Sequence, residues 1–265
     1  MPPLTIDDPR DPRLEDYGAL SDAERLRRHG VFIAEGRMVV RRLLTASRYS
    51  ARSVLLTPPA LAALEDALVL LPQVPVFLVT QDAMNGIAGF DIHRGCLAIG
   101  DREPVRGPLD VASASCLLAL EAVADPDNIG SLFRNAAALG ADGVLLDERS
   151  TDPLYRKAIR TSMGATLQLP FARADAFPDA LRGLRDQGFA LVALTPAPGT
   201  QAIADVARRL RGRRVALVLG HEGQGLSPAA LEACDLRAAI PMAAGVDSLN
   251  VATAAAIGMY LLGGR

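Results

Sequence analysis

The chain has 265 residues, half of them hydrophobic, and a formal net charge of −2 at pH 7. This length is sufficient for one large or two ordinary domains with real cores, and the hydrophobic content predicts a globular fold. A net charge so close to zero provides no overall attraction for nucleic acid, so a nucleic-acid partner would have to be bound by a local basic patch.

The sequence carries no pattern typical of export or of a membrane span. Its first residues, MPPLTIDDPRDPR, are acidic and rich in proline, unlike a signal or transit peptide. The longest apolar run is interrupted by Asn250, Thr253 and Gly258, and it is shorter than the roughly 20 residues that a membrane span needs. We therefore expect a cytoplasmic protein with no membrane partner.

The three cysteines, Cys96, Cys116 and Cys234, are odd in number and far apart, and no CxxC pair occurs. This pattern argues against a disulfide framework and against a zinc site. We expect the cysteines to be small buried residues and expect no bound metal.

The first hundred residues predict a small α/β unit. Helical patterns cover 35–47 and 59–69, strand-like runs cover 53–57 and 75–79, and a return strand follows through 90–100. The segment 101–110, DREPVRGPLD, has two prolines, a glycine and alternating charges, and is typical of a linker. We assign 1–23 to an N-terminal extension, 24–100 to the first domain and 101–110 to the linker.

A basic run crosses the start of this first domain. Between Arg25 and Arg52 there are eight arginines and one acid, Glu35. Such a run either forms a solvated helix face or binds phosphate, and the sequence leaves both interpretations open.

Residues 111–265 show a more regular alternation of strands and helices. Strand-like runs occur at 116–123, 143–147, 166–170, 189–195, 215–220 and 236–242. Helical patterns separate or follow them at 129–139, 153–162, 175–187, about 200–209, 228–233 and 249–262. Strands separated by helices predict right-handed crossovers and a mostly parallel sheet that is covered on both faces.

The strongest candidate site lies in the last fifty residues. The strand 215–220 leads into a glycine-rich turn that carries Glu222, and the strand 236–242 leads into a turn that carries Ser248 and Asn250. Because ligands of parallel sheets bind at the carboxyl ends of strands, two such turns on adjacent strands would form one pocket. The glycines at 220, 223 and 225 match neither GxGxxG nor the P-loop, so no dinucleotide or P-loop phosphate site is predicted.

A third polar segment precedes and opens the helix at 129–139. Asp125, Pro126, Asp127 and Asn128 follow a strand, and Gly130 and Arg134 share one face of the helix. A phosphate can be bound by the arginine and the positive helix N-terminus. The alternative is that Asn128 caps the helix and Arg134 pairs with a surface acid.

The three segments together resemble the SpoU (TrmH-like) family of RNA ribose 2′-O-methyltransferases. The resemblance rests on N-x-G-x-x-x-R-x-A at 128–136, on G-x-E-x-x-G-L at 220–226, and on IPM at 240–242 followed by SLNVA at 248–252. Their order and spacing match across 115–262. Residues 24–100 resemble, through AEGRMVVRRLL and HRGCLA, the L30e-like substrate-binding domain of that family. Where many relatives have HQG and NEG, this chain has HRG at 93–95 and HEG at 221–223.

This resemblance implies a SPOUT methyltransferase domain at 111–265, with a mostly parallel sheet and a deep trefoil knot, behind an L30e-like α/β domain. It also implies a homodimer whose C-terminal helix lies at the interface. S-adenosyl-L-methionine would be held in the knot, largely by backbone groups. The positions that correspond to its binding residues are Leu194, Thr195, Gly220, Glu222, Ile240, Met242 and Leu249.

The resemblance further implies methyl transfer to a ribose 2′-hydroxyl of RNA. The family assigns activation of that hydroxyl to the arginine that is Arg134 here. A guanidinium rarely releases a proton, so we prefer a substrate phosphate, held by Arg134, that orients the hydroxyl or accepts its proton. Asn128 and Asn250 would position the ribose or a neighbouring loop. Glu222 and Ser248 would brace the site and the arginine, and a purely structural role for Glu222 stays open. His221 stands where the family has an amide and is not our expected base. His29 and His93 are expected to contact RNA or to make local hydrogen bonds.

The RNA is expected to be ribosomal, because a basic front domain suits a folded RNA feature. Transfer RNA, methylation of a base instead of a ribose, and a non-catalytic RNA-binding factor of the same fold stay open as alternatives. The expected RNA-binding residues are basic and lie mostly in the front domain: Arg27, Arg28, Arg37, Arg41, Arg42 and Arg160.

Overall fold

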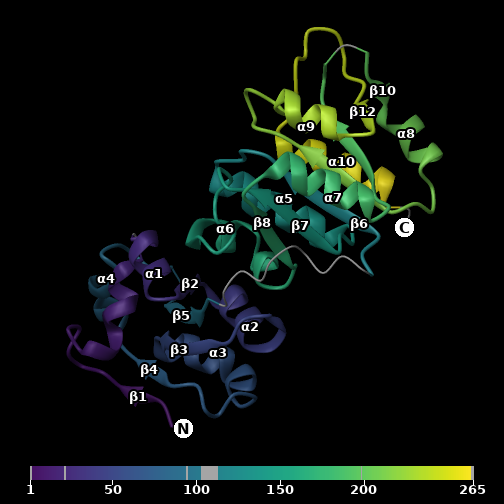
Figure 1. The fold of residues 1–265 in the computed structure, drawn as a ribbon. Coiled ribbons are helices and arrows are strands. Elements are labelled where there is room, and N and C mark those ends of the chain that lie inside the picture. The colour runs from purple at the N-terminus through teal and green to yellow at the C-terminus, as the bar shows by residue number, and fades with distance from the viewer. Residues whose placement is uncertain (1, 21, 94, 103–112, 198, 264–265) are drawn as a thin grey trace. The chain divides into compact units, whose positions relative to one another are not determined.

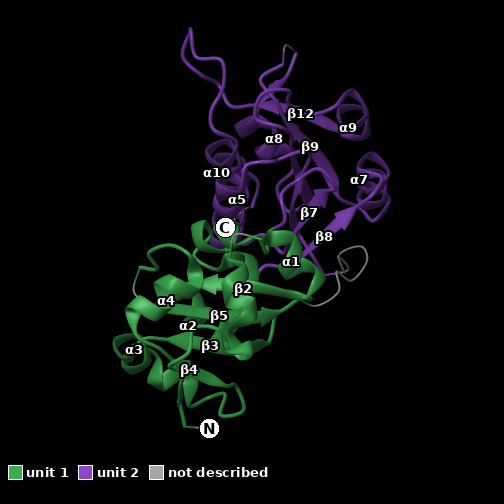
Figure 2. Cartoon of the chain, turned by 90° about the vertical axis from the view of Figure 1, so that its left-hand side faces the viewer, with its two compact units in different colours: residues 1–104, 153–168 green, residues 105–152, 169–265 purple. Residues whose placement is uncertain are grey.

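A computed structural model of the chain (Figure 1) describes residues 2–20, 22–93, 95–102, 113–197 and 199–263. The chain forms two compact units, the first made of residues 1–104 and 153–168 and the second of 105–152 and 169–265 (Figure 2). Most of the linker expected at 101–110 lies outside the described residues. Each unit is described by itself.

The first unit contains a five-stranded mixed sheet in the order β1-β4-β3-β5-β2. Its strands are β1 (Leu4–Thr5), β2 (Val31–Glu35), β3 (Ala51–Leu56), β4 (Val76–Leu78) and β5 (Cys96–Asp101). Strand β5 is antiparallel to β2 and β3, and the other pairs are parallel. Helices α2 (Arg37–Ala46) and α3 (Pro58–Leu68) pack together on one side, whereas η1 (Pro12–Ala19), α1 (Ala23–Arg28) and α4 (Gln81–Ala88) belong to another cluster around the strands.

The residues assigned to an N-terminal extension pack into this unit. Tyr17 is fully buried, and its hydroxyl lies 2.8 Å from the Ser53 hydroxyl in β3. Leu14 and Leu20 are buried in the same hydrophobic cluster. The helical pattern expected at 35–47 is also shorter than expected, because Glu35 ends β2 and the helix begins after Gly36, whose φ is +91°.

The segment 153–168, assigned from the sequence to the second domain, makes its contacts with the first unit. It contains α6 (Arg156–Thr161) and the 3-10 turn η2 (Ala165–Leu167). The prediction of a strand at 166–170 is therefore wrong. Met163 and Gly164 both have positive φ, and Leu167 N donates to Gly164 O, so the backbone of this stretch is satisfied by a local turn and not by a sheet.

The second unit contains a seven-stranded sheet that is parallel throughout, in the order β10-β12-β9-β11-β6-β7-β8. Its strands are β6 (Cys116–Leu120), β7 (Gly143–Asp147), β8 (Phe171–Ala174), β9 (Ala190–Leu194), β10 (Gln201–Ala202), β11 (Val215–Leu219) and β12 (Leu236–Ala239). The expected α/β architecture with a mostly parallel sheet is confirmed. The short strands β8 and β10 were not expected.

Helices cover both faces of this sheet. Helices α7 (Phe177–Asp186) and α9 (Pro228–Ala233) pack together on one face, and α5 (Pro126–Ala138) and α10 (Val251–Leu262) pack together on the other (Figure 2). Helix α8 (Ile203–Arg209) packs beside α10. The central strands β6, β7 and β11 are buried at every residue, which explains why they are continuous apolar runs in the sequence.

The two strands expected to be adjacent, β11 and β12, are separated by β9. Three neighbouring strands, β12, β9 and β11, therefore deliver their following loops to the same edge of the sheet. This arrangement brings a third loop, after β9, into the candidate site.

Within the described residues, no helix combines the length and the apolar character that crossing a membrane requires.

Candidate functional site

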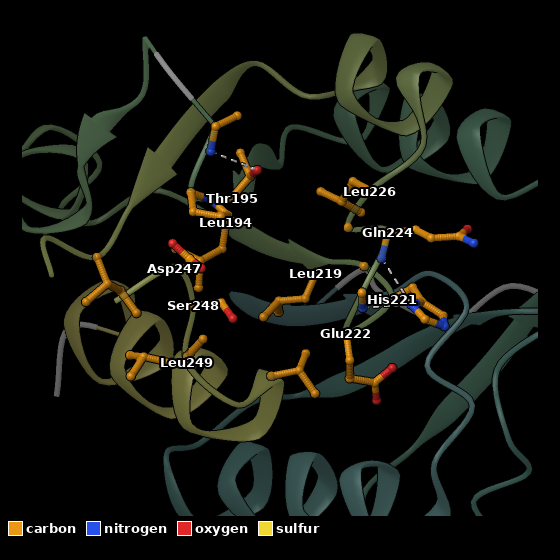
Figure 3. A pocket seen from close by; sticks show the side chains of 18 of the residues that line it. Leu194, Thr195, Leu219, His221, Glu222, Gln224, Leu226, Asp247, Ser248 and Leu249 are labelled. Atoms are coloured by element: carbon orange, nitrogen blue, oxygen red, sulfur yellow. Dashed lines mark hydrogen bonds between the residues drawn. The ribbon is translucent and has the colours of Figure 1, made fainter. Parts of the chain in front are cut away.

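Three loops at the carboxyl ends of β9, β11 and β12 enclose a cavity of about 530 Å³. Figure 3 shows the side chains around it: Leu194 and Thr195 at the end of β9, Leu219 to Leu226 around the glycine-rich turn, and Asp247 to Leu249 before α10. All seven positions that the resemblance assigned to cofactor binding line this cavity. Ser248 lines it as well. Its walls combine leucine side chains with the backbone of the glycine-rich turn, so it presents both apolar and hydrogen-bonding surface.

The glycine-rich turn closes tightly at its neck. A Cβ atom on Gly220 would lie 2.3 Å from the carbonyl carbon of Gly225, and Gly225 itself has a φ of +69°. Gly225 N donates to His221 O at 2.9 Å, which holds the two ends of the turn together. Glycine is thus required at 220 by close backbone approach and is favoured at 225 by backbone conformation.

His221 supports this turn from within. Its Nδ1 accepts hydrogen bonds from Gly223 N at 2.8 Å and from Gln224 N at 3.2 Å. With Nδ1 acting as the acceptor, the proton of the neutral ring is on Nε2. Neither ring nitrogen is then a free acceptor, and that His221 is not the base stays a prediction. An asparagine side-chain oxygen has the same acceptor capacity.

A chain of hydrogen bonds joins the three sequence motifs. Asn250 Nδ2 donates to Asn128 Oδ1 at 2.9 Å, and Asn128 Nδ2 donates to Glu222 Oε1 at 2.7 Å. Asn250 Oδ1 also accepts from Ala252 N at 2.9 Å and so caps α10. Asn128 is 122 residues from Asn250 and 94 from Glu222, so only the fold brings these polar groups together.

Arg134 is exposed on α5 and does not line the cavity. Arg134 makes no hydrogen bond or ion pair with any described residue. The alternative that it pairs with a surface acid is therefore not found among these residues. Gly130, which shares its helix face, is buried. The next residue after Arg134 was missed by the sequence analysis: Asn135 Nδ2 donates to Ala252 O at 2.9 Å and links α5 to α10.

A buried carboxylate under the site was also missed. Glu121 is 4% exposed and accepts from both the backbone N and the hydroxyl of Ser227, at 2.8 and 2.7 Å. Ser227 in turn caps α9 directly after the glycine-rich turn. The signal available in the sequence was an acid at the end of a continuous apolar strand, a position that a buried charge occupies only when it is paired.

A second acid, Asp147, ends the neighbouring strand β7. It accepts from Ala122 N and from the Ser150 hydroxyl, at 2.9 and 2.6 Å. Burial opposes the ionisation of Asp147, but these hydrogen bonds outweigh it and lower the pKa of the carboxyl group. Ala122 has a φ of +57°, so the backbone leaving β6 is held in an unusual conformation by this acceptor.

The arginines expected to bind RNA have different environments within the first unit. Arg27 and Arg28 are exposed on α1. Arg41 forms a two-pronged ion pair with Asp66 and also donates to Ala63 O, and Arg42 donates to Met163 O. The basic run is further neutralised by acids from elsewhere in the unit, through Arg25 with Glu15 and Arg52 with Asp101. Arg37 and Arg160 line a second cavity.

The remaining histidines and cysteines have local roles. His29 Nδ1 lies 2.8 Å from Asp16 Oδ1. None of the three cysteines is in a disulfide; Cys96 and Cys116 are buried, as expected, and Cys234 is partly exposed. Burial raises the pKa of the Cys96 and Cys234 thiols to about 12, so neither has the character of a reactive thiolate. No group of three or more metal-ligating side chains occurs among the residues that the structure describes.

Comparison with known proteins identifies the class to which this fold and cavity belong. Residues 115–260 match the model of the SpoU rRNA methylase family. The chain is 42% identical over 258 residues to an uncharacterized tRNA/rRNA methyltransferase of Mycobacterium tuberculosis, covering 96% of this chain and 89% of that protein. The chain therefore belongs to the SpoU rRNA methylase family, as its motifs predicted.

Solved structures agree with this assignment along almost the whole chain. An S-adenosylmethionine-bound rRNA methyltransferase from Sinorhizobium meliloti is 26% identical, with a TM-score of 0.80, covering 97% of this chain and 96% of that one. The SpoU methyltransferase AviRb from Streptomyces viridochromogenes is 23% identical, with a TM-score of 0.81 and coverages of 95% and 96%. The second likeness shows that the fold is shared.

Proposed function

We propose that this protein transfers a methyl group from S-adenosyl-L-methionine to a ribose 2′-hydroxyl of RNA, with ribosomal RNA as the favoured substrate. The observation that carries the proposal is the hydrogen-bonded chain of Asn250, Asn128 and Glu222, which joins the three family motifs beside the three-loop cavity. Methylation of RNA with this cofactor follows from family membership and from the cofactor-bound relative. The ribose position and the ribosomal substrate are the parts proposed here.

The cavity has the size and the surface that S-adenosylmethionine needs. Its volume of about 530 Å³ is in the usual range of small-molecule pockets. Leu194, Leu219 and Leu226 offer an apolar slot for the adenine, and the glycine-rich backbone lets amide and carbonyl groups approach the ligand closely. Thr195 and Ser248 bring hydroxyl groups to the same wall. We propose Leu194, Thr195, Gly220, Glu222, Ile240, Met242 and Leu249 as the binding residues.

The bound cofactor supplies an electrophilic methyl group on a sulfonium. In the transfer, a bond forms between the ribose oxygen and the methyl carbon, the carbon–sulfur bond breaks, and the hydroxyl proton leaves. The protein has to hold the oxygen in line with that bond, and such positioning can supply several kcal/mol, at most about 7–11. Asn128 and Asn250 are joined by a hydrogen bond and are proposed to fix the ribose, while Glu222 accepts a hydrogen bond from Asn128.

Arg134 is proposed to bind the RNA phosphate next to the reacting ribose. It is exposed and has no partner among the described residues, so its guanidinium fork is free for a phosphate. A guanidinium remains protonated at neutral pH, so Arg134 is not the proton acceptor. The phosphate that Arg134 orients accepts the proton of the ribose hydroxyl, and it either keeps this proton or passes it to water. Ser248 is proposed to brace the loop that leads to Asn250.

The proposal extends to three features that the resemblance implies: a trefoil knot in the second unit, an L30e-like fold for the first unit, and a homodimer. The clustering of the loops after β9, β11 and β12 around one cavity is compatible with the knot. The small residues Ala252, Ala255 and Gly258 on α10 are buried within the second unit, so they pack this helix inside its own chain and do not bear on the proposed dimer.

The test is transfer of labelled methyl from S-adenosylmethionine to total RNA from a strain lacking the gene, with the product mapped by nuclease digestion and mass spectrometry. We expect a 2′-O-methyl nucleotide in ribosomal RNA. Arg134→Ala should reduce the rate by about 10²-fold or more, the cost of losing one positioned charged donor. Arg182→Ala removes an exposed helix arginine that pairs with Asp179; it serves as the matched control and should leave the rate unchanged.

Other products would change the reaction or the substrate that we propose. A methylated base would place the chemistry on a nitrogen or carbon atom, and a methylated transfer RNA would change the substrate. Cofactor binding without any methyl incorporation would support a non-catalytic RNA-binding factor instead.

A further inference from the structure

The first unit contains a cavity of about 520 Å³ that the proposed chemistry does not use. It is lined by Glu35 and Arg37 at the junction of β2 and α2, by His93 before β5, and by Arg160 and Met163 from α6 and the turn that follows it. Met38, which is 57% exposed, completes an apolar wall with Met163. These residues come from three separate parts of the sequence, and all belong to the same compact unit.

The charges around this cavity do not cancel. Glu35 is 8% exposed, and its carboxylate accepts a hydrogen bond from Arg156. Arg160 Nη1 is 3.7 Å from the same carboxylate, and its side chain is 53% exposed. Because Arg156 already neutralises Glu35, the charges of Arg37 and Arg160 remain in excess at the cavity.

Arg37 carries an unmet hydrogen-bonding demand. Its Nε is buried and has no partner among the residues that the structure describes. A buried charged donor without an acceptor is unfavourable, and such a group in a native fold calls for a ligand or bound solvent. Arg37 is also the first residue of α2, a helix whose N-terminus has no side-chain cap. The positive end of that helix adds to the attraction for an anion in the same cavity.

We propose that this cavity binds one nucleotide of the substrate RNA, with its phosphate held by Arg37 and Arg160. The two guanidinium groups match the fork geometry that phosphate oxygens accept. Met38 and Met163 lie where the apolar faces of the ribose and base can pack, and His93 adds a polar edge. The identification of the anion as RNA phosphate rests on the proposed function. The first unit would therefore bind substrate RNA through this cavity. Arg41 and Arg42 are less available for RNA, because they already donate hydrogen bonds to Asp66 and to Met163 O.

The test is the salt dependence of RNA binding by the full chain. A short fluorescein-labelled single-stranded RNA of mixed sequence is titrated with the wild type, Arg37→Gln and Arg160→Gln at a series of salt concentrations. Loss of one phosphate contact should lower the slope of log K against log salt by about 0.7. The control Arg10→Gln removes an equally charged side chain that is 92% exposed in the same unit, and it should leave the slope unchanged.

The affinity for S-adenosylmethionine, measured in parallel, should be the same in all four proteins. An unchanged slope in both cavity variants would overturn the proposal while leaving methyl transfer intact. If the slopes fall as expected but no RNA is methylated, the nucleotide site stands and the proposed function fails. Thermal unfolding checks that Arg37→Gln is folded, and if it is not, Arg160→Gln carries the test because that side chain is half exposed.

Discussion

His221 stands where the family resemblance leads us to expect an amide, and its ring nitrogen accepts two backbone hydrogen bonds of the turn. We predict that His221→Asn retains cofactor affinity and turnover, because the amide oxygen can accept in the same place. His221→Leu removes both hydrogen bonds, at about 0.5–1.5 kcal/mol each, and should weaken cofactor binding roughly 5- to 100-fold. Isothermal titration with S-adenosylmethionine measures both variants. Loss of turnover in His221→Asn with normal cofactor binding would instead make His221 catalytic.

At the residue scale, the motifs identified the polar residues of the candidate site, but not the residues that support the site through hydrogen bonds. Asn128, Glu222 and Asn250 were expected at the site, and the fold joins them in one hydrogen-bonded chain. Glu121 and Asn135 were missed because each bonds to a group more than a hundred residues away in the sequence. The local count of arginines overestimated the basic patch because the acids that pair with it, Glu15, Asp66 and Asp101, lie outside the counted run.

At the scale of elements, the glycine-rich turn after β11 offers a matched pair of substitutions. Gly220→Ala would put a Cβ 2.3 Å from the backbone of Gly225, a contact that only a shift of the turn can relieve. Gly223→Ala meets only the His221 ring, at 3.5 Å, which is ordinary contact. We predict that Gly220→Ala lowers cofactor affinity at least tenfold, whereas Gly223→Ala changes it little. Equal affinities in equilibrium titrations of the two variants would mean that the turn does not shape the cavity.

The alternation of strands and helices in the second unit was predictable because buried parallel strands are continuous apolar runs. β6, β7, β9, β11 and β12 all coincide with expected strands. The run at 166–170 has a similar composition, yet Met163 and Gly164 turn the chain into a local 3-10 conformation first. The order of the sheet was less accessible, because β9 inserts between β11 and β12 through contacts that no local pattern encodes.

At the scale of the whole molecule, the division into two compact units predicts where cofactor binding is felt. Every residue of the three-loop cavity belongs to the second unit. A ligand present at 100 times its Kd stabilises the state that binds it by about 2.7 kcal/mol. We predict that S-adenosylmethionine slows amide hydrogen exchange at residues 194–197, 219–226 and 240–251, while exchange in residues 31–101 is unchanged.

Gly220→Ala separates binding from non-specific effects in this experiment. At a cofactor concentration that saturates the wild type, the variant should show weaker protection of the same three segments, in proportion to its reduced occupancy. A short labelled RNA should in addition slow exchange at the start of α2, in the first unit, if Arg37 and Arg160 bind its phosphate. Equal slowing of both units by the cofactor alone would contradict this assignment, because the cavity that we propose for it has no residue in the first unit.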